Sequence, residues 1–299
     1  MTKIGFVGLG TMGAPMACNL LRGGFQLRVH DLNPDAVARL EAEGAKPCVS
    51  AAEAAREADA VITMLPNGEH VEAALLGEGG ALAGASPGAL VIDMSTILPL
   101  VTDRIASCLV AKGFGFVDAP VGRSSQHSVE GKLLIMVGGE ENDVRRARPI
   151  LEKLGDTVVH CGPAGAGSRM KIVNNFMSIT LNVTTAEALT PAEASGQDPE
   201  LARQVMLGTV AGQGHMGTTY PAKVLKSDLS RGFMIDLAAK DLGLALRFAA
   251  ELGIGLETRA AAKIAYHAAQ GQGRGRQDWT SLYQLRRAAL RASKTPPVA

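Results

Sequence analysis

Four polar side chains recur at helical spacing in one segment of this sequence. They are Lys171, Asn174, Asn175 and Ser178. On a helix, residues three, four and seven positions apart share one face, so these groups form a polar stripe. An ammonium, two amides and a hydroxyl together can donate hydrogen bonds to a substrate oxygen. The stripe is therefore either a substrate-facing surface or an ordinary solvated helix face that carries one lysine.

The residues between these polar positions are apolar and are expected to be buried. They are Ile172, Val173, Phe176, Met177 and Ile179. A polar stripe flanked by buried side chains costs free energy unless its groups have partners. The rest of the chain must show what those partners are.

A cofactor site is indicated at the start of the chain, where a short apolar run, Lys3 to Val7, precedes Gly8-Leu-Gly10-Thr-Met-Gly13. The run has the pattern of a buried strand, and a helical pattern follows the glycines. A strand, G-x-G-x-x-G and a helix are the dinucleotide-binding fingerprint. We expect Gly8, Gly10, Thr11, Met12 and Gly13 to contact the cofactor, with the helix N-terminus facing its pyrophosphate.

Asp31 completes this fingerprint, since it ends a second strand 18 residues after Gly13. A carboxylate there can accept hydrogen bonds from the adenosine ribose and would repel a 2′-phosphate. No arginine follows at once, so NAD(H) is favoured over NADP(H). The alternative is that Asp31, together with Asn33-Pro34, caps the next helix.

Apolar runs continue to alternate with helical patterns. The expected strands are Ala60–Leu65, Ala89–Asp93, Phe114–Asp118, Leu133–Val137 and Thr157–His160. This alternation predicts a doubly wound parallel sheet, which binds ligands outside the carboxyl ends of its strands. The loops at those ends contain Leu65-Pro66-Asn67, Ser95-Thr96 and Gly122-Arg123-Ser124. Leu65, Pro66, Asn67 and Thr96 are therefore expected to contact the cofactor.

The pattern becomes helical after about residue 163. We predict a Rossmann domain over residues 1–163 and an all-helical substrate and oligomerisation domain over residues 164–299, joined by a long helix over about 167–194. Pro191 predicts a kink or break in that helix near Leu189. Further helices are expected at Glu200–Thr209, Asp236–Leu252 and Leu256–Gln270, then a loop at 273–279, a short helix and a flexible tail at 294–299.

Composition excludes several classes of protein. With 30 basic and 29 acidic residues, the net charge of +1 indicates no nucleic-acid or membrane partner. No apolar run reaches the length of a membrane span. The four cysteines are scattered without metal-ligand spacing and are typical of buried thiols in a reducing cytoplasm. No metal site is expected.

Taken together, the motifs resemble those of the β-hydroxyacid dehydrogenase family, of the 3-hydroxyisobutyrate type. The matching segments are Phe6 to Gly13, Asp93 to Thr96, Asp118 to Val121, Gly165 to Asn175 and Lys240 to Leu242. The resemblance covers nearly the whole chain. It implies hydride transfer between a nicotinamide and a carbonyl carbon, with Lys171 handling the proton. Asn175 is expected to orient Lys171 or to bind the substrate oxygen.

The resemblance has three further implications. Lys240 is expected to lie close to the cofactor, although it can instead pair with Asp236 on a helix surface. The helical domain implies a homodimer or homotetramer. His215 and the segment from Arg274 to Asp278 are left without an assigned role.

One segment departs from the general family pattern. Where most members have a Ser-Gly-Gly loop, this chain has Gly122-Arg123-Ser124-Ser125, which resembles the 3-sulfolactaldehyde reductase subgroup. A sulfonate is a permanent anion with three acceptor oxygens, and an arginine offers it a fork of donors. The small anionic substrate is therefore expected to contact Gly122, Arg123, Ser124, Asn174 and Ser178. For Arg123, the alternatives are an ion pair with Glu130 or a cofactor phosphate contact.

The leading prediction is a cytoplasmic, NADH-dependent 3-sulfolactaldehyde reductase. A 4-hydroxybutyrate dehydrogenase, also called a succinic semialdehyde reductase, is the nearest alternative, because Arg123 can also bind a carboxylate. A catalytically inactive scaffold is disfavoured because Lys171 is retained. An imine reductase is disfavoured because such enzymes usually carry another residue at the lysine position.

Overall fold

The structure is a computed structural model that describes residues 2–293 except 216, 218, 227, 229, 231, 232 and 252. Contacts divide the chain into two compact units, residues 1–177 and 178–299. The division falls inside the long helix α8 (Ala166–Ala194). The predicted tail at 294–299 and residue 252 lie outside the described residues.

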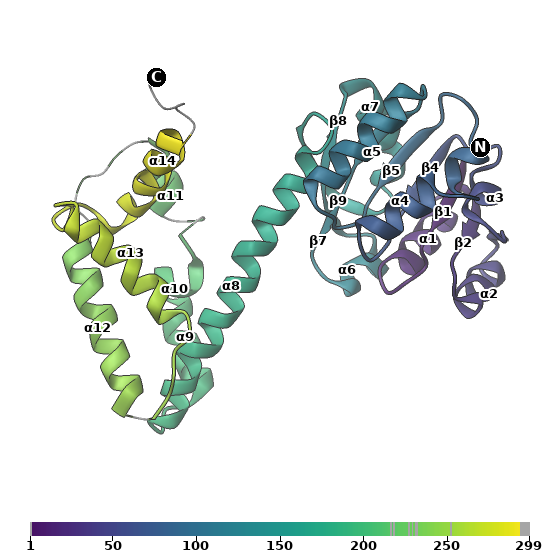
Figure 1. Cartoon of the computed structure of the whole chain (residues 1–299). Coiled ribbons are helices and arrows are strands. Elements are labelled where there is room, and N and C mark those ends of the chain that lie inside the picture. Colours follow the sequence, from purple (N-terminus) through teal and green to yellow (C-terminus); the bar gives the residue numbers. More distant parts are fainter. Residues whose placement is uncertain are drawn as a thin grey trace, which may run out of the picture. The chain divides into compact units, whose positions relative to one another are not determined.

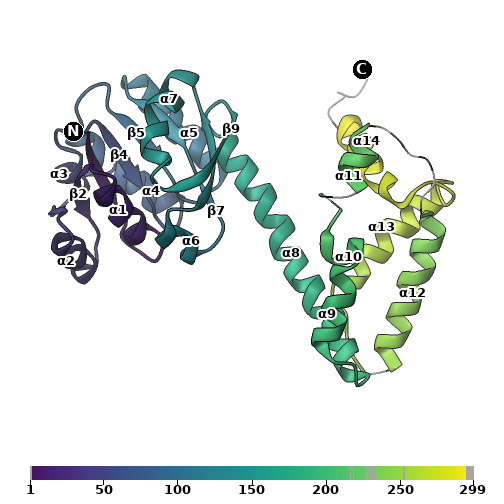
Figure 2. The same ribbon diagram turned by 180° about the vertical axis from the view of Figure 1, so that it is seen from behind.

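The first unit is built on a nine-stranded sheet, with helices on both faces (Figures 1 and 2). Its strands are β1 (Lys3–Val7), β2 (Gln26–His30), β3 (Lys46–Pro47), β4 (Ala60–Thr63), β5 (Leu90–Asp93), β6 (Gly115–Asp118), β7 (Val121–Gly122), β8 (Leu133–Gly139) and β9 (Gly155–Gly162). Its helices before α8 are α1 (Gly13–Arg22), α2 (Pro34–Ala42), α3 (Ala51–Ala55), α4 (Gly68–Leu76), α5 (Pro99–Ala111), α6 (Ser125–Glu130) and α7 (Glu141–Leu151).

The sheet order confirms the doubly wound prediction. Neighbouring strands run β3-β2-β1-β4-β5-β6-β8-β7, and β9 pairs with β8. The strands from β3 to β6 are parallel to their neighbours. However, β8 is antiparallel to both β6 and β7, which the sequence did not predict. The chain therefore reverses between β7 and β8, in the segment that begins with Arg123.

The core has two layers, one on each face of the sheet. Along the strands, alternate side chains point to opposite faces. Phe6 and Ile62 pack with Met16 of α1 on one face, whereas Val61 packs with Leu75 and Leu109 of α4 and α5 on the other. This two-sided burial explains why the strands have continuous apolar sequences.

The second unit is helical among the residues that the structure describes. Its helices after α8 are α9 (Pro199–Leu207), α10 (Val210–Gln213), α11 (Thr219–Ala222), α12 (Ile235–Glu251), α13 (Arg259–Gly271) and α14 (Leu282–Ser293). The predicted helices over 200–209 and 256–270 correspond to α9 and α13 with shifted ends. α8 continues through Pro191 to Ala194, so the predicted break is wrong. Pro191 lies in the last turn, so the helix loses only the one hydrogen bond that the N–H of this residue would donate, and it ends soon after.

Candidate active site

The glycine loop between β1 and α1 has the geometry of a phosphate cradle. Gly8 has a φ of +100°, and a Cβ there would lie 2.3 Å from the Met64 carbonyl oxygen. A Cβ on Gly13 would lie 2.0 Å from the Gly8 oxygen, so both positions require glycine to form the loop. A Cβ on Gly10, by contrast, would meet no described atom within 4 Å. The open space at Gly10 fits a pyrophosphate at the start of α1, where no side chain caps the helix.

Asp31 follows β2 directly and supports this loop. Its carboxylate accepts hydrogen bonds from the Leu9 amide at 2.6 Å and the Asn33 amide at 2.7 Å. The cap of α2 is Asn33, whose side chain accepts from the Asp35 amide at 3.0 Å. Asp31 is therefore not the helix cap, and it remains half-buried beside the glycine loop, where a ribose would lie.

A cavity of about 490 Å³ lies beside Asp31 on the side of β4. It is lined, among others, by Gly8, Asp31, Leu32, Val49, Pro66 and His70. Leu32 and Val49 are 89% and 90% exposed, which is unusual for aliphatic side chains in a well-packed domain. Two apolar groups beside the Asp31 carboxylate would fit a flat adenine ring. Neither residue belongs to a motif, so the sequence alone did not indicate them.

A second cavity, of about 770 Å³, lies on the α2 side of the same carboxylate. Gly10, Thr11 and Asp31 line it, together with Arg39 from α2. Arg39 is eight residues beyond Asp31, and its position next to that carboxylate was not evident from the residues that directly follow Asp31. Met12 does not line either cavity, and its carbonyl oxygen accepts a hydrogen bond from the Ser128 hydroxyl at 3.1 Å.

A buried aspartate joins the loops after β4 and β5. Asp93 accepts from the Thr63 hydroxyl at 2.8 Å and the Ser95 amide at 3.1 Å, and Ser95 in turn accepts from the Leu65 amide at 2.9 Å. The Asp93 Oδ2 atom has no partner among the described residues, and burial raises the pKa of this carboxyl. Asp93 thus fixes Leu65 relative to Ser95-Thr96, the two loops expected to face the cofactor.

The other cofactor residues predicted on these loops are exposed. Pro66, Asn67 and Thr96 all lie at the surface of the first unit. The Asn67 side chain caps α4, accepting from the His70 amide at 2.9 Å. The Asn67 side-chain amide would therefore have to bind the cofactor and cap the helix at the same time.

The polar stripe lies on α8 as the spacing predicts. Lys171 and Asn175 are half-buried, whereas Asn174 and Ser178 are exposed. Burial lowers the pKa of Lys171, which eases proton transfer from its ammonium. The Asn174 amide nitrogen lies 3.4 Å from the Asn175 side-chain oxygen. These groups form a set of donors around one lysine, which the sequence identified by its 3.6-residue period.

The predicted burial of the apolar residues on α8 is wrong for three of them. Ile172, Val173 and Phe176 are 39%, 65% and 73% exposed. The reason is that α8 packs on the first unit only through its first turn, where Gly167 and Ser168 are buried. Met177 is half-buried, and the Ile179 side chain lies outside the described residues.

Arg123 occupies a backbone conformation that favours glycine, with a φ of +72°. Its guanidinium donates to Asp156 Oδ1 at 2.7 Å, to the Lys132 carbonyl and to the Thr157 hydroxyl at 3.3 Å. Thr157 and then Arg123 lower the pKa of Asp156. An ion pair is thus present, but its partner is Asp156 rather than Glu130.

The residues beside Arg123 adopt a short strand and a turn. Gly122 is buried and pairs with Leu134 of β8. The Ser124 hydroxyl lies 2.7 Å from His127 Nδ1. The segment is therefore held from both sides, and the left-handed turn at Arg123 sits where the general family pattern has glycine.

In the second unit, Lys240 lies on the exposed side of α12. It lines a cavity of about 450 Å³ with Tyr266 and His267. Asp236, its suggested partner, accepts a hydrogen bond from the Gln270 side chain at 2.7 Å. The cofactor contact of Lys240 stays a prediction.

The segment before α14 anchors part of the second unit. Asp278 is buried and accepts from the Lys223 ammonium and the Phe233 amide, each at 3.1 Å. The neighbouring Trp279 ring packs edge-on against His215 at 4.8 Å and Phe233 at 5.2 Å. His215 and this segment, left without a role from sequence, therefore belong to one packed cluster.

Two further features bear on the class of protein. In the described part of the chain, no three His, Cys, Asp or Glu side chains gather as a metal ion requires. None of the described helices combines the length and apolar character needed to span a membrane.

Comparison with known proteins identifies relatives of this chain. The profile of the NAD binding domain of 6-phosphogluconate dehydrogenase matches residues 3–162. The profile of the NAD-binding domain of NADP-dependent 3-hydroxyisobutyrate dehydrogenase matches residues 165–286. The chain is 49% identical to 3-sulfolactaldehyde reductase of Escherichia coli (strain K12) over 284 residues, which cover 95% of each chain.

Solved structures show the same architecture. Mycobacterium tuberculosis 3-hydroxyisobutyrate dehydrogenase with L-serine is 35% identical, with a TM-score of 0.67 over 96% of this chain and 99% of that one. An imine reductase variant from Myxococcus stipitatus with NAD⁺ reaches a TM-score of 0.85 over 95% and 98% of the two chains. At 17% identity, the latter likeness concerns the fold alone.

The fold and the glycine loop define an NAD-binding oxidoreductase with a Rossmann domain and a helical domain. Both profiles and the 49% identical relative show that the chain belongs to the 3-hydroxyisobutyrate dehydrogenase family.

Proposed function

We propose that this enzyme uses NADH to reduce 3-sulfolactaldehyde to 2,3-dihydroxypropane-1-sulfonate, in the breakdown of sulfoquinovose. The observation that carries the proposal is the 49% identity, over 95% of both chains, to a reductase of that name. The Gly122-Arg123-Ser124 segment supports it, because it brings a guanidinium to a loop that has glycine in the general family pattern.

The chain's own residues handle the proton in this reaction. When bound, NADH supplies a hydride from C4 of its nicotinamide ring to the aldehyde carbon. The Lys171 ammonium stabilises the negative charge that develops on the aldehyde oxygen and donates its proton there. Asn175, four residues further along α8, orients Lys171 or the substrate oxygen. The product alcohol leaves Lys171 neutral, to be reprotonated by solvent.

Cofactor binding is assigned to the glycine loop, Asp31 and the loops after β4 and β5. The carboxylate of Asp31 favours NADH, since a 2′-phosphate would meet its negative charge. Arg39 lines a cavity with Asp31 and is the residue that would weaken the preference for NADH over NADPH. Lys240 is assigned a contact with the cofactor from the second unit.

The anionic end of the substrate is assigned to Gly122, Arg123, Ser124, Asn174 and Ser178. In the structure, the Arg123 guanidinium is held by Asp156, and its side chain is 33% exposed. Substrate binding by the guanidinium therefore requires it to exchange the Asp156 carboxylate for the sulfonate. Exposed ion pairs of this kind are weak because water screens the charges, so the sulfonate can replace the Asp156 carboxylate.

Steady-state rates with two aldehydes and two cofactors test the proposal. We expect kcat/KM to be higher for the sulfonated aldehyde than for succinic semialdehyde, and higher with NADH than with NADPH. A higher kcat/KM for the carboxylated aldehyde would reverse the substrate assignment in favour of a 4-hydroxybutyrate dehydrogenase. The Arg123–Asp156 pair itself keeps that alternative open, because it shows that this guanidinium binds a carboxylate.

Replacing Arg123 by glycine tests the anion contact. We expect KM for the sulfonated aldehyde to rise about 10- to 100-fold, because a hydrogen bond to a charged group contributes about 1.5–3 kcal/mol. KM for an uncharged aldehyde should stay within about twofold. Glycine also suits a φ of +72°, so the variant should keep its thermal stability.

Asp156→Asn is the matched control for this variant. It removes the negative charge that competes with the substrate for the guanidinium but keeps Arg123, so KM for the sulfonated aldehyde should stay the same or fall. If Arg123→Gly raises KM equally for charged and uncharged aldehydes, Arg123 does not bind the anion.

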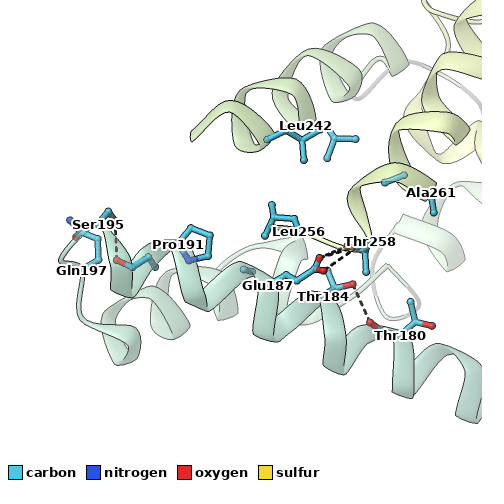
Figure 3. A pocket seen from close by; sticks show the side chains of 14 residues that line it. Thr180, Thr184, Glu187, Pro191, Ser195, Gln197, Leu242, Leu256, Thr258 and Ala261 are labelled. Carbon is cyan, nitrogen blue, oxygen red and sulfur yellow. Dashed lines mark hydrogen bonds between the residues drawn. The ribbon is translucent and has the colours of Figure 1, made fainter. Parts of the chain in front are cut away.

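We also propose that the enzyme is a homodimer or homotetramer. The second unit contains a cavity of about 1020 Å³ between the second half of α8, α12 and α13, lined mainly by apolar side chains (Figure 3). On α9, Leu201 and Val205 are 51% and 62% exposed. Such apolar surface is expected to be covered by a second copy of the chain.

Sedimentation equilibrium measures this state directly. The expected mass is two or four times the 31.0 kDa of one chain. A concentration-independent mass of one chain would rule the assembly out.

A reducing cytoplasm is the compartment we propose. It is supported by the four cysteines, all of which are free, with Cys48 buried and the other three half-buried.

A further inference from the structure

Asp118, the last residue of β6, holds the start of the helix that carries Lys171. Its side chain is fully buried. Oδ1 accepts from the Gly165 amide at 2.7 Å, and Oδ2 accepts from the Ser168 amide at 2.6 Å. Burial raises the pKa of this carboxyl, and the two amide donors oppose that shift. The carboxylate thus occupies the positive end of α8, where free N–H groups require an acceptor.

Two glycines make room for this carboxylate. A Cβ on Gly138 would lie 2.4 Å from Asp118 Oδ1. A Cβ on Gly167 would lie 3.0 Å from Oδ2 and 2.3 Å from the Met136 carbonyl oxygen. The glycine of the α8 motif is therefore needed for close approach of the helix to Asp118, rather than for contact with a ligand.

Asp118 also belongs to the segment that carries the anion-binding residues. Arg123 is five residues further along, and the intervening Val121 is fixed by pairing with Ile135 of β8. On the other side, Lys171 is three residues beyond Ser168, less than one helical turn. One buried carboxylate therefore joins the segment that leads to Arg123 and the helix that presents Lys171.

We propose that Asp118 is a positioning residue, which sets the place of Lys171 relative to the Gly122-Arg123-Ser124 loop. This inference rests on the role of Lys171 in the proposed function. Asp118 does not touch the reacting atoms. Its effect is geometric, because a displacement of about 1 Å at a catalytic group can lower a rate about 100-fold.

Asp118→Asn is the direct test. The variant keeps the shape of the side chain but turns one acceptor into a donor, which meets an amide N–H. We expect kcat to fall about 10- to 100-fold, with the Kd of NADH within about twofold of wild type. The deuterium isotope effect on kcat with 4-deuterated NADH should rise, because hydride transfer becomes more rate-limiting.

The control is Asp103→Ala in α5, which removes an ion pair to Arg169 in the first turn of α8. Asp103 binds Arg169 at 2.6 and 3.0 Å, but this ion pair is exposed. Its loss should change kcat by less than about threefold and leave the isotope effect unchanged, since exposed pairs contribute little. Equal effects of the two variants would overturn the proposal.

The isotope effect separates positioning from partial unfolding. A variant that merely loses folded enzyme has a lower kcat per total protein but an unchanged isotope effect, and that result would refute the proposal. If Asp118→Asn is insoluble, Gly138→Ala, which pushes on Oδ1, takes its place with the same expectation. If both variants are insoluble, Asp118 is required for folding, and that result would also refute the positioning role.

The wild-type enzyme serves as the internal reference. If it fails to reduce the sulfonated aldehyde, the proposed substrate is wrong. The comparison of variants is then made on whichever aldehyde the wild type reduces.

Discussion

Replacing Lys171 by alanine is expected to lower kcat for aldehyde reduction by about 10²- to 10⁴-fold, the usual contribution of a general acid. The Kd of NADH should stay within about twofold, because Lys171 lies outside the two cavities beside Asp31 to which cofactor binding is assigned. Stopped-flow turnover and fluorescence titration of NADH measure the two quantities. Near-normal turnover would remove Lys171 from the mechanism.

The pH dependence gives a second readout of the same residue. Burial lowers the pKa of Lys171 below the ordinary lysine value of about 10.4. Reduction uses the protonated ammonium, so kcat/KM should fall as pH rises through that lowered pKa, and oxidation of the alcohol should rise over the same range. Lys171→Arg is the control, since a guanidinium keeps the charge but does not titrate there.

The Rossmann half of the fold was predictable because its signals are local. Each parallel strand buried on both faces is a continuous apolar run, and the glycine loop marks the first turn. Strand direction is not encoded this way. β8 has the same apolar pattern as β5, yet it runs antiparallel to β6. The side chain of Arg123 consequently lies near Asp156, a neighbour that no motif indicated.

The ends of helices depended on distant contacts. The helix predicted from Leu256 begins at Arg259 instead. The Glu187 carboxylate, from α8, accepts from the Glu257 amide and from the Thr258 amide at 3.1 Å, so these residues form the turn before α13 (Figure 3). A cap supplied from 70 positions away leaves no trace in the local sequence.

Among the site residues, types and spacing identified Lys171, Asn175 and Asp31 as candidates. The roles of the buried aspartates Asp118 and Asp93 were missed, because these roles exist only in three dimensions. Asp118 and Asp93 each end a strand and look alike in sequence. Asp118 accepts hydrogen bonds from the N-terminus of α8, and Asp93 joins the loops after β4 and β5.

Gly10→Ala should abolish tight cofactor binding while leaving the fold intact. A Cβ at Gly10 meets no described protein atom within 4 Å, and Gly10 does not have a positive φ. The methyl group would instead occupy the space assigned to the pyrophosphate. Loss of one charge-assisted hydrogen bond costs about 1.5–3 kcal/mol, so the Kd of NADH should rise at least about 10- to 100-fold.

Gly13→Ala is the matched variant, because its Cβ would lie 2.0 Å from the Gly8 carbonyl oxygen. This variant should lose thermal stability as well as NADH binding, since the backbone of the loop must move. Differential scanning calorimetry with and without NADH separates the two variants. Without NADH, the Tm of Gly10→Ala should equal that of the wild type. NADH should raise the Tm of the wild type but not that of Gly10→Ala. Wild-type NADH affinity in Gly10→Ala would show that the pyrophosphate lies elsewhere, and the fingerprint would then describe only a tight turn.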